Sequence, residues 1–207
     1  MLHELDPMLY VLAVIIGVGC FIPFPQARKI FNSLNQEKIV GWPDSRRMLL
    51  GLNVVIFGGL LASTWTWVIH RQLLGAGGST ACTVQGCHTL IGDSRWNEVP
   101  LLGVEWGIFG LLAFTVLGFI ALSLLLSPTE EWNRTWLKGG LVFSGLGLPA
   151  VAWLVLVELV LADDAPVICP FCTMAHIATV ASFVMFLLLS RSHDGGDWEK
   201  AVEPLPE

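Results

Sequence analysis

The sequence predicts an all-α integral membrane protein, a four-helix transmembrane bundle with one additional N-terminal transmembrane helix. Hydrophobic residues make up 54% of the 207 residues and charged residues only 14%, whereas a typical soluble domain has about 25% charged residues. Four apolar stretches are long enough to cross a bilayer as helices, which takes roughly 20 residues each. They cover residues 48–74, 101–126, 136–161 and 171–190.

A fifth apolar stretch, residues 7–24, is shorter than the other four and ends next to Pro25. A secretory signal peptide begins with basic residues, and no Lys or Arg precedes this stretch. We therefore expect the segment to remain in the protein as a membrane helix. The predicted organisation is an N-terminal transmembrane helix (1–27), a cytoplasmic loop (28–47), a four-helix bundle (48–191) and a cytoplasmic tail (192–207).

The basic residues predict the orientation, because Lys and Arg remain on the cytoplasmic side of short loops. Of the 11 basic residues, five lie between the first two spans, two between the third and fourth, and two after the fifth. Only Arg71 and Arg95 fall on the other side. This split places the N-terminus outside and the C-terminus on the cytoplasmic side of the membrane. The basic residues form no arm or stripe, so no nucleic-acid binding is expected.

Two cysteine pairs fall on the outer side of this topology, which faces the periplasm or exterior. Cys82 and Cys87 lie in the loop after the second span, and Cys169 and Cys172 begin the last span. The positive end of a helix dipole favours a thiolate at that position, and the spacing of three residues puts both sulfurs on one helical face. His176 lies on the same face one turn deeper. These features predict thiol–disulfide exchange at the outer face, through mixed disulfides.

Two other interpretations of the cysteines remain open on the residues alone. Both pairs could be static bridges, although a bridge across the start of a helix constrains little. The pairs could also bind a metal, because Cys-x-x-Cys is a common zinc half-site. The possible soft ligands on this face are Cys82, Cys87, His88, Cys169, Cys172 and His176. Cys20, inside the first span, is expected to be a small hydrophobic residue in a helix.

Three segments resemble the vitamin K epoxide reductase family. Residues 87–96 (CHTLIGDSRW) resemble its loop segment, in which a cysteine precedes a Ser-Arg-Trp-like element. Residues 99–103 (VPLLG) with 108–112 (IFGLL) are similar to the start of the next family helix, and Cys169-Pro-Phe-Cys172 is similar to its redox motif. The loop pair precedes the Cys-x-x-Cys pair, which is the reverse of the order in the bacterial quinone reductases that oxidise the periplasmic thiol oxidase. The resemblance covers about residues 46–190.

The resemblance implies four helices around a quinone of the ubiquinone or menaquinone type. By position, Cys82 resembles the cysteine that exchanges with a thioredoxin-like partner, and Cys87 resembles the loop cysteine that passes electrons to Cys169. Cys172 resembles the cysteine that faces the quinone, and Ser94 matches a family serine near that site. The implied activity is a quinone-dependent thiol–disulfide oxidoreductase that supports disulfide bond formation.

The sequence also departs from the family pattern. His176 stands where animal members have a tyrosine that hydrogen-bonds the quinone, and Trp106 stands where they have a quinone-contacting asparagine. The N-terminal helix lies outside the family's common core. Many bacterial members carry a C-terminal thioredoxin-like domain, which we do not recognise here, so we expect a separate secreted or membrane-anchored thioredoxin-like partner. The alternative is a non-enzymatic membrane protein that binds a metal or a partner through its outer cysteines.

Overall fold

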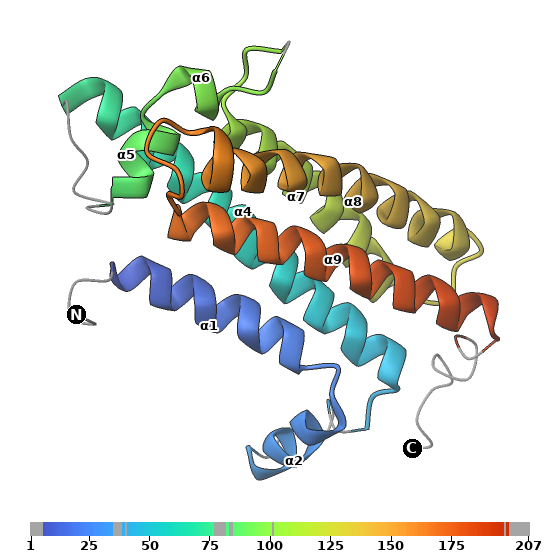
Figure 1. The fold of residues 1–207 in the computed structure, drawn as a ribbon. Coiled ribbons are helices and arrows are strands. Elements are labelled where there is room, and N and C mark those ends of the chain that lie inside the picture. Colours follow the sequence, from blue (N-terminus) through green and yellow to red (C-terminus); the bar gives the residue numbers. More distant parts are fainter. Residues whose placement is uncertain are drawn as a thin grey trace.

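The computed structural model describes residues 6–34, 39, 41–76, 82, 85–100, 102–196 and 198. These residues form an all-α bundle (Figure 1), as predicted, with an isolated β-bridge between Glu98 and Glu105 as the only β-structure in the described ranges. The elements are α1 (Pro7–Phe21), α2 (Pro25–Ser33), α4 (Asp44–Ala76), α5 (Gln85–Ile91), α6 (Ser94–Asn97), α7 (Trp106–Leu126), α8 (Asn133–Leu156), the π-helical turn η1 (Val157–Leu161) and α9 (Pro170–Asp194).

Four spans are long and apolar enough to cross a membrane: α4, α7, α8 continued by η1, and α9. The pair α1 and α2 passes the same test as a fifth span, with a bend of 111° between its halves. The chain is therefore a multi-pass membrane protein. Helix α2 covers residues 25–33, most of which lie in the predicted cytoplasmic loop (28–47), and it was not anticipated. It starts at Pro25, whose fixed φ suits the first turn of a helix and which follows directly after the bend.

Helix α4 lies at the centre of the bundle and packs against α1, α7 and α9. Half of the most apolar 18-residue stretch of α4 is buried, whereas only 17% of the corresponding stretch is buried in the span made of α8 and η1. Glycines allow the close contacts. A Cβ atom at Gly59 of α4 would lie 2.4 Å from the ring of Phe114 in α7, and one at Gly140 of α8 would lie 2.3 Å from the ring of Phe186 in α9. Small residues let membrane helices approach in this way.

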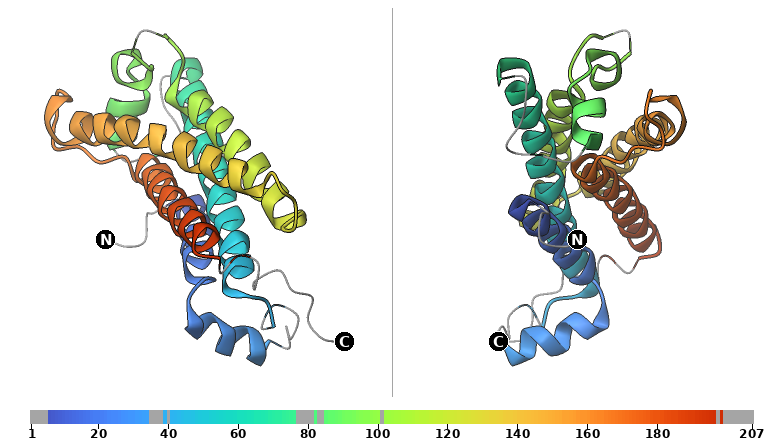
Figure 2. Two further views of the ribbon diagram at one scale, coloured as in Figure 1. Left: turned by 90° about the vertical axis from the view of Figure 1, so that its right-hand side faces the viewer. Right: turned by 60° about the vertical axis from the view of Figure 1, so that its left-hand side comes forward.

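The two ends of the bundle carry different residues. The cysteine end, where α4 finishes and α7 and α9 begin, carries α5 and α6, and the opposite end carries α2 (Figures 1 and 2). Both cysteine pairs lie at the cysteine end, because Cys87 of α5 is bonded to Cys82, and Cys169 and Cys172 are at the start of α9. Most described basic residues lie at the opposite end, in α2, at the starts of α4 and α8, or at the finish of α9. They are Arg28, Lys29, Arg46, Arg47, Arg134, Lys138 and Arg191. Lys38 and Lys200, which also supported the predicted orientation, lie outside the described residues, as do residues 77–81 of the outer loop and 199–207 of the tail.

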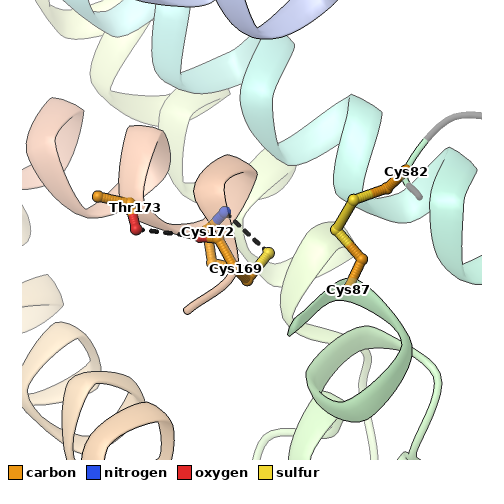
Figure 3. The surroundings of a disulfide bond; sticks show 5 residues. All are labelled: Cys82, Cys87, Cys169, Cys172 and Thr173. Carbon is orange, nitrogen blue, oxygen red and sulfur yellow. Dashed lines mark hydrogen bonds between the residues drawn. A yellow bond between two sulfur atoms is a disulfide. The ribbon is translucent and has the colours of Figure 1, made fainter. Parts of the chain in front are cut away.

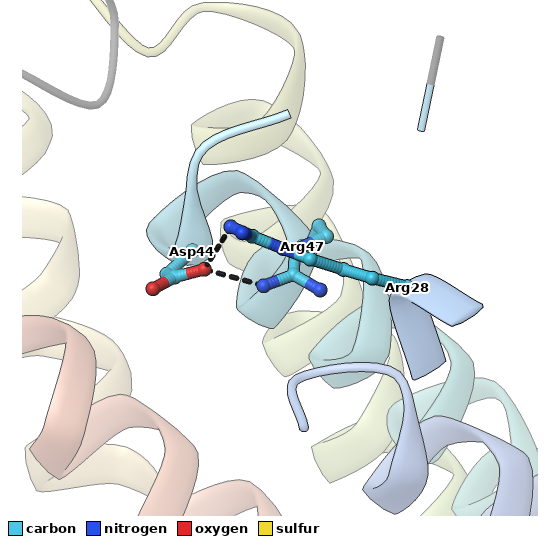
Figure 4. A network of polar contacts seen from close by, with 3 residues as sticks. All are labelled: Arg28, Asp44 and Arg47. Atoms are coloured by element: carbon cyan, nitrogen blue, oxygen red, sulfur yellow. Dashed lines mark hydrogen bonds and ion pairs between the residues drawn. The ribbon is translucent and has the colours of Figure 1, made fainter. Parts of the chain in front are cut away.

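A small ionic network fixes α2 at the opposite end (Figure 4). Asp44, in the first turn of α4, accepts a hydrogen bond of 2.7 Å from Arg28 of α2 and another from Arg47. The Arg47 side chain is 1% exposed, and its ion pair offsets part of the cost of burying a guanidinium group, whose Nε and Nη1 have no partner among the described residues. A carboxylate is also favourable at the positive end of a helix dipole. The network therefore joins α2 to the start of the central helix.

Candidate active site

Both cysteine pairs lie in one buried hydrophobic cluster at the cysteine end. Cys82 and Cys87 form a disulfide, whereas Cys169 and Cys172 are free thiols with their sulfur atoms 2.6 Å apart. Cys82, Cys87 and Cys169 are at most 2% exposed. The Cys169 sulfur points from the start of α9 towards the side where the disulfide lies (Figure 3). The fold thus brings together two pairs that are far apart in the sequence.

The start of α9 holds the Cys169 sulfur in a defined position. Cys169 is the N-cap residue, and Pro170 follows at the first helical position, where proline is favoured. The backbone N–H of Cys172 donates a hydrogen bond of 3.3 Å to the Cys169 sulfur. The Thr173 hydroxyl donates to the Cys169 carbonyl at 3.0 Å (Figure 3). A backbone N–H and the positive end of α9 therefore face a sulfur that carries negative charge during disulfide exchange.

Helix α5 contacts the backbone just before this motif. A Cβ atom at Gly86 would lie 2.1 Å from the carbonyl oxygen of Ile168 and 3.2 Å from the Cys169 nitrogen. Only a residue without a side chain allows this approach, which brings the adjacent Cys87 to the redox motif. His70 of α4 anchors α5 from the other side, because its Nδ1 lies 2.6 Å from the Ile91 carbonyl oxygen.

A cavity extends from Cys172 into the bundle between α4, α7, α8 and α9. Cys172 and His176 line it from α9, and Trp106 lines it from the start of α7. Most of the wall is apolar and includes Ile91, Phe109, Phe114, Leu117, Val151 and Leu154. A mostly apolar wall with a few polar groups suits a small-molecule site.

Several buried polar atoms around this cavity have no hydrogen-bond partner among the described residues. They are Trp96 Nε1, Asn97 Nδ2, Trp106 Nε1, Glu158 Oε1 and His176 Nε2. A buried polar group left unpaired costs about 1–3 kcal/mol, so the groups that converge on this cavity are available to hydrogen-bond a ligand or water there. Four of the five atoms are nitrogens of indole, amide or imidazole groups. They can donate hydrogen bonds to a ligand that carries acceptors.

The structure brings together most of the residues predicted for the site. The four cysteines share one cluster, and His176 and Trp106 line the adjoining cavity. Ser94 does not line the cavity: it is the exposed first residue of α6. Asn97, three residues further along that helix, is buried and lines the cavity instead.

Sequence analysis missed several polar residues in the cavity wall, among them Glu158 and Asn97. A signal existed for Glu158, because it is the only acidic residue in the stretch 136–161, and ionisable residues inside membrane spans are costly and often functional. Asn97 follows the Ser-Arg-Trp element in a polar segment, where an amide residue carries no such signal.

Comparison with known proteins places the chain in a family. The family model described as "Vitamin K epoxide reductase family" matches residues 50–187, well over half of the chain. No curated protein and no solved structure matches the chain. In the described part of the chain, no group of three or more His, Cys, Asp or Glu residues is placed to hold a metal ion. The chain belongs to the vitamin K epoxide reductase family, and its four spans and buried cysteine pairs are those of a membrane thiol oxidoreductase.

Proposed function

We propose that the protein transfers electrons from the dithiol of a thioredoxin-like partner, through Cys82/Cys87 and then Cys169/Cys172, to a membrane quinone. The observation that carries this proposal is the continuous arrangement of sulfurs. The loop disulfide shares a buried cluster with Cys169, the Cys169 sulfur lies 2.6 Å from that of Cys172, and Cys172 lines the apolar cavity. The partner leaves with a disulfide, so the protein supports disulfide bond formation.

Each transfer between thiols is a disulfide exchange. A partner thiolate attacks Cys82 and breaks the Cys82–Cys87 bond, and the partner's second thiol releases the reduced loop pair. The Cys87 thiolate then attacks Cys169 of a Cys169–Cys172 disulfide, which frees Cys172, and Cys82 completes the exchange. The resulting dithiol Cys169/Cys172 reduces the quinone by two electrons and returns to the disulfide.

The cavity suits a quinone of the ubiquinone or menaquinone type as the electron-accepting substrate. Its apolar wall matches the ring, and a quinone carries two carbonyl oxygens that accept hydrogen bonds. The Nδ2 of Asn97, the Nε1 of Trp106 and the Nε2 of His176 are buried nitrogens without partners among the described residues. We propose that they supply these hydrogen bonds, with His176 in the position that a tyrosine occupies in the animal members.

Access for the partner requires the Cys82 segment to move, because the Cys82 side chain is 2% exposed. We propose that the cysteine end faces the periplasm or exterior of a plasma membrane. Basic residues gather at the opposite end, as expected for the cytoplasmic side, and an oxidising compartment preserves disulfides. A secreted or membrane-anchored thioredoxin-like protein would meet the cysteine end there.

Replacing Cys87 with alanine should trap the partner on Cys82. Without Cys87 the loop disulfide cannot form, so an oxidised partner forms a mixed disulfide with Cys82 that no loop thiol resolves. Non-reducing gels of membranes from cells that express Cys87→Ala are expected to show a Cys82-dependent adduct with a thioredoxin-like protein, identified by mass spectrometry. The double variant Cys82→Ala/Cys87→Ala is the matched control and should show no adduct. An equally abundant adduct in the double variant would contradict the assignment of Cys82.

A further inference from the structure

We propose that Glu158 is a catalytic residue that carries the proton of the Cys172 thiol to a quinone oxygen. The proposal rests on the quinone reduction proposed above and adds a route for one of its protons. Glu158 belongs to η1, and its side chain is 6% exposed inside a membrane span. It lines the same cavity as Cys172, and its Oε1 has no hydrogen-bond partner in the described chain. A carboxyl group in this setting is costly, which indicates a function.

The fold holds Glu158 next to the redox motif through two backbone contacts. The Glu158 carbonyl oxygen accepts a hydrogen bond of 2.8 Å from the N–H of Val167, and the backbone N–H of Cys169 interacts with the Glu158 carboxylate. These interactions place Glu158 beside the segment that presents Cys169. Its Oε1 atom has no hydrogen-bond partner in the described chain and is available to the cavity. The π-helical turn reinforces this reading, because single π-helical turns are frequent at functional sites.

Few other ionisable groups face Glu158. The described ionisable residues that line the cavity besides Glu158 are Cys172 and His176, both on α9. From α4 the lining contributes the hydroxyls of Ser63 and Thr66, and α5, α6 and α7 contribute no carboxyl group or second imidazole. The pair of His70 and Glu105, whose Nε2 and Oε1 atoms lie 3.5 Å apart, does not line the cavity. Among the described lining residues, Glu158 is thus the one carboxyl group.

Quinone reduction consumes two protons together with two electrons, so both protons need a route from the thiols to the quinone oxygens. Two S–H bonds break and one S–S bond forms between Cys169 and Cys172, while two electrons and two protons pass to the quinone and two O–H bonds form. Glu158 takes the proton of the Cys172 thiol and gives it to one quinone oxygen, so that it returns to a carboxylate. The Cys169 thiol releases the second proton; His176 accepts it and then donates it to the other oxygen, so that the imidazole is neutral again.

The proposal is tested with purified full-length protein and a water-soluble quinone, using a small dithiol as reductant. Glu158→Gln should lower kcat about 10²-fold, the lower range for general acid–base catalysis, with the KM for quinone changed less than about threefold. Glu158→Ala should lose as much, and formate should restore part of that loss because it replaces the missing carboxyl group. Glu105→Gln is the matched control: it removes a half-buried carboxyl group outside the cavity and should retain kcat.

A second measurement needs neither a variant nor turnover. A hydrophobic carbodiimide modifies only protonated carboxyl groups in apolar surroundings, so mass spectrometry of the wild-type protein should find the adduct on Glu158, and quinone should protect the residue. An unlabelled Glu158, or an unchanged kcat in Glu158→Gln, overturns the proposal. A loss in Glu158→Ala that formate does not restore also overturns it, because the side chain is then structural. If the wild-type protein reduces no quinone, the proposed function itself is refuted. This result is distinct from the results that overturn only the role of Glu158.

Discussion

Replacing Cys172 with alanine will abolish quinone reduction, whereas replacing Cys82 with alanine will leave most of it when a small dithiol supplies the electrons. Among the described residues, Cys172 is the only cysteine that lines the cavity, so every electron path to the quinone ends at its sulfur. A small reagent can reduce the Cys169–Cys172 disulfide directly, and it makes the loop pair dispensable. A protein reductant needs the loop pair, so with it the Cys82→Ala variant should fall to background.

The measurement is the decrease in quinone absorbance with each reductant, on purified protein of matched concentration. Cys20→Ala is the control for loss of a thiol, because Cys20 is partly buried in α1 and packs against the hydrophobic cluster away from the cysteine pairs. It should retain activity with both reductants. An equal loss in Cys82→Ala and Cys172→Ala with the small dithiol would contradict the order of the relay.

A single methyl group at Gly86 should uncouple the two cysteine pairs. In Gly86→Ala the new Cβ atom would lie 2.1 Å from the Ile168 carbonyl oxygen, which is backbone and cannot rotate away. Helix α5 must therefore move from the redox motif, and Cys87 moves with it. A misplacement of about 1 Å can cost about 10²-fold in rate. We expect a loss of that size with a thioredoxin-like reductant and less than about a twofold loss with a small dithiol.

The matched control for this prediction is Gly75→Ala. Gly75 lies near the end of α4, also at the cysteine end, and a Cβ atom there meets nothing within 4 Å. Both variants exchange glycine for alanine, but only Gly86→Ala introduces a clash. The explanation is wrong if Gly86→Ala retains activity with the protein reductant, or if it loses activity equally with both reductants.

The spans and the placement of the cysteines were predictable because their signals are local. A bilayer demands roughly 20 apolar residues for each helix, and the stretch 171–190 therefore identified α9 with the Cys169/Cys172 pair at its start. The basic residues then placed the loop pair at the same end. The segment from Cys87 to the Ser-Arg-Trp element indicated the vitamin K epoxide reductase family. The family model confirms this membership over residues 50–187.

The wall of the cavity was less predictable because it depends on how the short helices pack. Trp96 and Asn97 turn inwards on α6 while Ser94 remains exposed, and a helix of four residues is too short to show which face it buries. The role of Gly86 follows from a contact with Ile168, about 80 residues away in the sequence. No local pattern reports such a contact. Glu158 was visible in the sequence, but its position beside Cys169 follows from the turn that η1 makes before the last span.

The central claim is that Cys169 and Cys172 reduce a quinone, and a single-turnover measurement tests it most directly. Fully reduced protein is mixed without oxygen with limiting ubiquinone or menaquinone analogue, and the reaction is stopped with an alkylating reagent. Our account predicts one hydroquinone for each disulfide formed, with Cys169–Cys172 as the first disulfide in the peptide map and Cys82–Cys87 following it. Hydroquinone formed while Cys169 and Cys172 remain alkylated, or no hydroquinone at all, would contradict it.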